Sequence, residues 1–89
     1  MKAVVSVMGV DRTGIIAKVS GCLYKHSVNI LDINQTIMQN IFTMVMLVEF
    51  SKDSKDYNLV MNELDKISKE IGVEIRMQNE DIFNSMHRI

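Results

Sequence analysis

The residues best suited to bind a small molecule lie in one short loop near the amino terminus. This loop, VDRTG at residues 10–14, offers an acid, a base, a hydroxyl and a flexible glycine in succession. If a helix begins here with Thr13 as its N-cap, the first backbone N–H groups of that helix lack internal partners and favour an anionic group. Gly14 lets a ligand approach the backbone closely, and Asp11 could face a cation. The loop therefore suits a ligand with both a carboxylate and an ammonium group, as in a free amino acid. The alternative is that Asp11 and Thr13 only cap the helix and Gly14 only relieves the turn.

Other kinds of site find less support in the sequence. Cys22 is the only cysteine, which excludes an internal disulfide and any site that needs several thiolates. His26 and His87 have no nucleophile or second ligand at a helpful spacing, so both are expected on the surface. We therefore expect no metal, no cofactor and no catalytic residue.

Length and charge narrow the possible partners. A chain of 89 residues predicts a single domain, residues 1–89, around one core. A net charge of -1 gives no electrostatic footprint for nucleic acid or for an anionic membrane, and no apolar stretch approaches a membrane span. The single cysteine fits a reducing cytoplasm, which is the expected location.

Apolar periodicity predicts the elements that must hold the loop in place. Helices are expected over 15–26 and 57–71, and strands over 3–8, 28–38, 41–50 and 73–78. Gln39-Asn40 is expected to form a tight hairpin turn, and Gly72 to cap the second helix. A short C-terminal helix is expected from Glu80, with an apolar stripe made of Ile82, Phe83 and Met86.

The order of these elements predicts the fold. Strand, helix, strand, strand, helix, strand is the order of the ferredoxin-like split βαβ fold. We predict an α+β domain, ferredoxin-like βαββαβ, with a four-stranded antiparallel sheet that carries both helices on one face. The strand over 41–50 is apolar on both sides, since Val45 and Leu47 oppose an apolar face made of Phe42, Met44, Met46, Val48 and Phe50. Such a strand requires cover on both sides, so we predict a homodimer.

A fold of this kind hosts many unrelated functions, which the residues must separate. A metal-chaperone version needs a Cys-x-x-Cys motif, which is missing. An RNA-binding version needs exposed aromatic residues with basic neighbours, and Phe42 and Phe50 have none. An acylphosphatase-like enzyme would use Arg12 to grip phosphate and an asparagine to place a water. That enzyme is disfavoured because the loop supplies only one glycine, beside an acid that repels phosphate.

Two motifs lie in these elements: DRTGII at residues 11–16, and Val28-Asn29-Ile30 at the opening of the second predicted strand. Together they resemble the ACT domain, a regulatory module of the same fold. The resemblance covers the whole chain in element order and is strongest from Met1 to Phe50. It is closest to the small stand-alone ACT proteins of bacteria and archaea. The chain is also similar to the ACT halves of the glycine-cleavage-system repressor and to the ACT region that precedes formyltetrahydrofolate deformylase.

The resemblance implies a binding site at a subunit interface. ACT domains usually pair, often side by side into a continuous sheet. Many bind an amino acid where the first loop and helix start of one subunit meet the opening of the second strand. One side of this pocket would consist of Asp11, Thr13, Gly14 and Ile15. The other side would consist of Asn29, Ile30 and Leu31.

Two functions remain open at this point. The first is a non-catalytic, dimeric regulatory module that binds an amino acid and acts on an enzyme or a transcription factor. The second is a protein interaction module without a small ligand, which uses the apolar sheet face and the stripe at Ile82, Phe83 and Met86.

Overall fold

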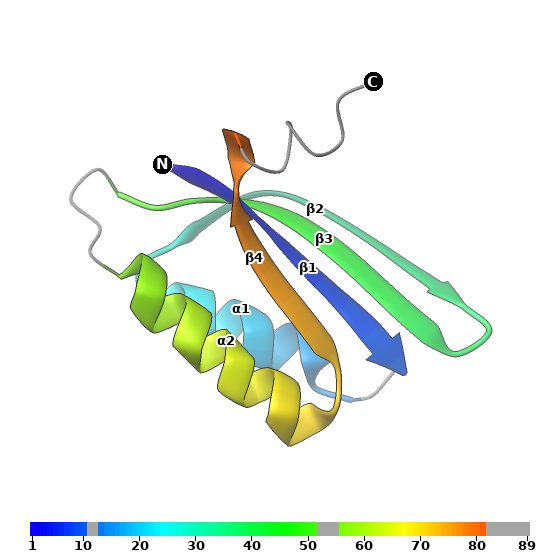
Figure 1. The fold of residues 1–89 in the computed structure, drawn as a ribbon. Helices are drawn as coiled ribbons and strands as arrows, with labels where there is room; N and C mark the ends of the chain where they lie inside the picture. Colours follow the sequence, from blue (N-terminus) through cyan, green and yellow to red (C-terminus); the bar gives the residue numbers. More distant parts are fainter. Residues whose placement is uncertain (11–12, 52–55, 82–89) are drawn as a thin grey trace.

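The computed structural model describes residues 1–10, 13–51 and 56–81, and it has the predicted ferredoxin-like fold (Figure 1). The elements are β1 (Lys2–Val10), α1 (Ile15–Lys25), β2 (Asn29–Met38), β3 (Ile41–Glu49), α2 (Tyr57–Ile71) and β4 (Glu74–Asn79). The strands form one antiparallel sheet in the order β2-β3-β1-β4, and both helices cover the same face of it. The predicted element order is confirmed, with boundaries that differ by at most two residues.

The core lies between this sheet and the two helices. Alternation places every second residue of β1 and β3 on the helix side, where they are buried: Ala3, Val5, Val7, Phe42, Met44, Met46 and Val48. The helices close the core with one apolar stripe each: Ile15, Val19, Cys22 and Leu23 from α1, and Val60 and Leu64 from α2. The predicted apolar face of the third strand is therefore confirmed as the centre of the core.

Two predicted turns are also confirmed. Gln39 and Asn40 both have positive φ, 50° and 71°, as the tight hairpin between β2 and β3 requires. Gly72 caps α2 with φ 71°, and its N–H donates to the Ser68 carbonyl oxygen at 2.9 Å.

The end of α1 uses a non-glycine residue in the same conformation. Ser27 has φ 56°, and its N–H donates to the Tyr24 carbonyl oxygen at 3.0 Å. The N–H of Val28 donates to the Leu23 carbonyl oxygen at 2.8 Å, which completes the closing pattern of the helix. This turn fixes the direction in which the chain enters β2.

The strand β2 lies at the edge of the sheet and extends beyond the cover of the helices. All its residues are exposed. Ile33 and Ile37 pair with residues on the helix side of β3, yet they are 45% and 59% exposed. The register shifts between Ile30 and Asp32, so Leu31 lies at this irregularity and does not continue the alternation of Ile33 and Ile37. One chain therefore leaves an apolar strand edge uncovered beside α1.

The face of the sheet opposite the helices also carries exposed apolar side chains. Met8, Ile41 and Val45 are 53%, 51% and 39% exposed. Glu80 and Asp81 have helical backbone geometry, and the rest of the predicted C-terminal helix, including its stripe at Ile82, Phe83 and Met86, lies outside the described residues. Within the described ranges, no helix has the length and apolar character that crossing a membrane requires.

Candidate functional site

The start of α1 differs from the prediction in the residue that caps it. Gly14 occupies the N-cap position with φ 91°, in the left-handed region, and the N–H of Lys18 donates to its carbonyl oxygen at 2.9 Å. Thr13 as N-cap is therefore wrong. The turn needs a backbone conformation that costs a residue with a Cβ about 1–2 kcal/mol, so glycine takes the position. Among the residues that the structure describes, no side chain provides a capping hydrogen bond to the first N–H groups of the helix.

The backbone at this helix start is open. A Cβ built on Gly14 would meet none of the other described atoms within 4 Å, and Thr13 is exposed. The Ile15 side chain is 1% exposed and belongs to the core, so only its backbone N–H can reach a ligand. Asp11 lies outside the described residues.

The second half of the predicted site lies at the opposite end of α1. Asn29, Ile30 and Leu31 open β2 and are exposed. With 11 residues α1 is about 16 Å long, and Gly14 and Asn29 lie beyond its opposite ends. A single chain therefore does not bring the two halves together.

The opening of β2 lines a wide hollow together with the outer side of α1. This hollow of about 610 Å³ is lined by Ala17, Ser20, Gly21, Tyr24, Val28, Asn29 and Ile30. Tyr24 is 85% exposed. Gly21 stands inside the helix, where glycine costs about 1 kcal/mol relative to alanine. A Cβ there would meet nothing within 4 Å among the described residues, so packing within one chain gives no reason for glycine.

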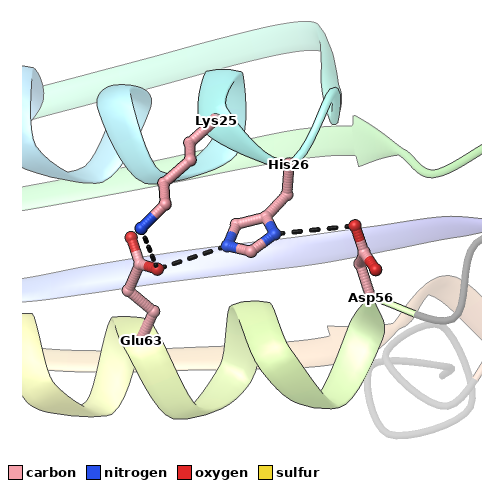
Figure 2. A network of polar contacts seen from close by, with 4 residues as sticks. All are labelled: Lys25, His26, Asp56 and Glu63. Atoms are coloured by element: carbon pink, nitrogen blue, oxygen red, sulfur yellow. Dashed lines mark hydrogen bonds and ion pairs between the residues drawn. The ribbon is translucent and has the colours of Figure 1, made fainter.

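A polar cluster that the sequence analysis did not predict joins the end of α1 to α2 (Figure 2). Its members are Lys25, His26, Asp56 and Glu63. The Nε2 atom of His26 lies 3.2 Å from Oε1 of Glu63, and its Nδ1 lies 3.5 Å from Oδ2 of Asp56. Lys25 Nζ lies 3.2 Å from the same Glu63 oxygen.

The His26 side chain is only 15% exposed, so the predicted surface position is wrong. The available signal was its spacing of one helical turn from the buried Cys22, which places both on the inner side of α1.

This cluster also shifts two ionisation equilibria. The pKa of the Cys22 thiol is raised from 9.0 to about 12. Burial is the largest cause, and the hydrogen bond to Glu63 and the charge of that carboxylate add to it. The hydrogen bond from His26 is the largest cause that lowers the pKa of Glu63. Cys22 is therefore a neutral thiol at physiological pH and a poor nucleophile.

Comparison with known proteins places the chain in a family. Residues 2–78 match the family model of the ACT domain. A UPF0237 protein of Methanocaldococcus jannaschii is 51% identical over 88 residues, which cover 99% of this chain and 98% of that protein.

Solved structures agree with this placement. The ACT domain protein from Streptococcus pneumoniae is 37% identical, with a TM-score of 0.80 and 93% of both chains covered. A glycine cleavage system transcriptional repressor shares the fold at 23% identity, with a TM-score of 0.78 over 86% of this chain and 44% of that one. The resemblance found in the sequence is confirmed: the chain belongs to the ACT domain family, whose members are generally regulatory ligand-binding modules.

Proposed function

We propose that this chain is a non-catalytic, cytoplasmic regulatory module that binds an amino acid between two copies of itself. The observation that carries the proposal is the start of α1, where an open glycine takes the place of a capping side chain. Backbone N–H groups at such a start attract a carboxylate through their partial positive charge. The carboxylate of an amino acid would take the position that a capping oxygen takes in other helices.

The opening of β2 supplies the complementary groups. The Asn29 amide can donate to a carboxylate or accept from an ammonium group, so it suits either end of a zwitterion. Asp11, in the loop before Gly14, adds a carboxylate for the ammonium group. Ile30 and Leu31, both exposed, would contact the side chain of the ligand.

A two-fold dimer would unite these groups into two identical sites. If the two-fold axis runs perpendicular to α1 and passes near its middle, the two copies of α1 lie antiparallel, and the Gly14 end of one approaches the Asn29 end of the partner. The uncovered Ile33 and Ile37 give such a dimer an apolar surface to bury, and Gly21 lets a second backbone come close. The regulated protein would be an enzyme or a transcription factor whose activity depends on whether these sites are occupied.

The test is a calorimetric screen of the twenty amino acids against the purified chain at millimolar concentration. A ligand of six to ten heavy atoms supports an affinity from about micromolar to millimolar. Gly14→Ala should weaken the response at least about tenfold, because the added Cβ distorts the turn that presents the N–H groups.

Gly72→Ala is the matched control for this experiment. Gly72 also has a positive φ, 71°, and open space around its Cβ position. Both substitutions should cost about 1–2 kcal/mol of stability, and only the one at Gly14 should reduce binding. Equal loss of binding in both variants, or no heat with any amino acid, would count against the proposal.

The second candidate is a protein interaction module without a small ligand. Met8, Ile41 and Val45 on the open sheet face favour it, since exposed apolar patches often mark protein contacts. A folded dimer that gives no heat with any amino acid, but retains an enzyme or repressor in stoichiometric amounts, would establish this function instead.

A further inference from the structure

The cluster between α1 and α2 has the donor atoms and spacing of a transition-metal site. One ligand atom each from Cys22, His26 and Glu63 lie within 4.8 Å of one another. Cys22 lies in the last turn of α1, His26 follows as its C-cap, and Glu63 faces them from α2. Nε2 of His26 and Oε1 of Glu63 are 3.2 Å apart. Two ligands of a tetrahedral zinc ion, each about 2.0–2.1 Å from the metal, are separated by about 3.3 Å.

Asp56 provides the outer partner that a ligating histidine usually has. Its Oδ2 lies 3.5 Å from Nδ1 of His26, on the side of the ring away from Glu63 (Figure 2). In the metal-free protein Nε2 donates a hydrogen bond to Glu63. When a metal ion binds Nε2, the ring proton is carried by Nδ1, where a carboxylate can accept it. Asp56 therefore stabilises the tautomer that metal binding at Nε2 requires.

Two groups disfavour the binding of a metal ion at this cluster, the Lys25 ammonium and the proton of the Cys22 thiol, and both can be displaced. Lys25 places its ammonium 3.2 Å from the Glu63 oxygen, but its side chain is 67% exposed and can turn into solvent. The Cys22 thiol is buried and keeps its proton in the metal-free protein. A metal ion removes that proton on coordination, because the thiolate is the ligating form. Binding should therefore release a proton and strengthen as the pH rises.

We propose that Cys22, His26 and Glu63 bind one Zn²⁺ ion, with Asp56 orienting His26. A mixed set of sulfur, nitrogen and oxygen donors suits zinc and disfavours Mg²⁺ and Ca²⁺, which prefer oxygen alone. Three protein ligands leave the fourth position for water. The ion would join α1 to α2 directly before the turn at Ser27 that leads into Asn29.

Cobalt titration of the full chain, freed of metal and kept reduced, tests the site. Co²⁺ should bind at one ion per chain, with a thiolate charge-transfer band in the near ultraviolet and the intense visible bands of tetrahedral coordination. Added Zn²⁺ should remove these bands and raise the melting temperature. Asp56→Asn should weaken binding about 10–100-fold, as loss of an outer partner does elsewhere.

Variants separate this site from adventitious binding. Cys22→Val should abolish the charge-transfer band, and Glu63→Gln should weaken binding at least about tenfold. His87→Ala, which removes the second histidine of the sequence, should change neither. Circular dichroism checks each fold, and Glu63→Gln carries the test if Cys22→Val does not fold. Absence of one-to-one binding, Co²⁺ bound without thiolate charge transfer, or affinity unchanged in Glu63→Gln overturns the proposal. Gly14→Ala should leave metal binding intact, since the two sites are independent.

Discussion

Single residues at the two ends of α1 decide what chemistry each end can support. At the start, Gly14 has a φ of 91° and no side chain, so among the described residues no side chain caps the first backbone N–H groups of the helix. At the end, the Ser27 turn holds His26 against α2, where it contacts two carboxylates. One end of the helix therefore suits an anionic ligand group, and the other suits a cation.

The burial of Cys22 gives a prediction about its reactivity. With its pKa raised to about 12, the thiol should react with iodoacetamide at pH 9 more than about a hundredfold slower than a free cysteine, half of which is thiolate there. Mass spectrometry of timed samples measures the rate, and the same reaction in denaturant provides the control. Labelling as fast in the native protein as in denaturant would show that Cys22 is accessible and ionised.

At the scale of elements, Gly9 lets β1 pass close to the segment before β4. A Cβ at Gly9 would lie 2.8 Å from Val73 Cγ1 and 3.1 Å from the Val73 backbone Cα. Gly9→Ala should therefore lower the free energy of unfolding by about 1–3 kcal/mol, as overpacking does in other cores. Urea denaturation followed by circular dichroism measures the loss.

A double-mutant cycle identifies the cause of that loss. Val73→Ala removes the Cγ1 atom that meets the new methyl group, so the two substitutions together should cost less than the sum of their separate effects. Strict additivity would mean that the clash is not the source of the instability.

The elements themselves could be predicted because apolar spacing in this chain is regular. The spacing of Val60 and Leu64 fits the helical period in α2, and the alternation in β3 fits the strand period of two residues. Three features could not be predicted from spacing. The cap at Gly14 depends on a turn angle, the carboxylates that contact His26 depend on where α2 packs, and the exposure of Ile33 depends on β2 being an edge strand. The candidate residues at both ends of α1 could be named from sequence, but the distance between them follows only from the fold.

At the scale of the whole molecule, the exposed side of β2 predicts how copies associate. Ile33→Lys combined with Ile37→Lys should convert a dimer into a folded monomer, because both side chains are exposed in the single chain and lie on the proposed contact. Analytical ultracentrifugation measures the mass, and circular dichroism checks the fold. Leu59→Lys, on the exposed side of α2 with 56% exposure, is the control and should stay dimeric. If the variant with both substitutions is still dimeric, the dimer contact lies somewhere other than this side of β2.

The most direct test of the account is complementation between two inactive variants. Gly14→Ala and Asn29→Ala should each weaken binding of the amino acid found in the screen at least about tenfold. If each site takes Gly14 from one chain and Asn29 from the other, a mixed dimer regains one intact site. Random pairing after joint refolding should then restore about a quarter of the wild-type sites at wild-type affinity in calorimetry. No recovery in a mixture shown to contain mixed dimers would contradict a site shared between subunits.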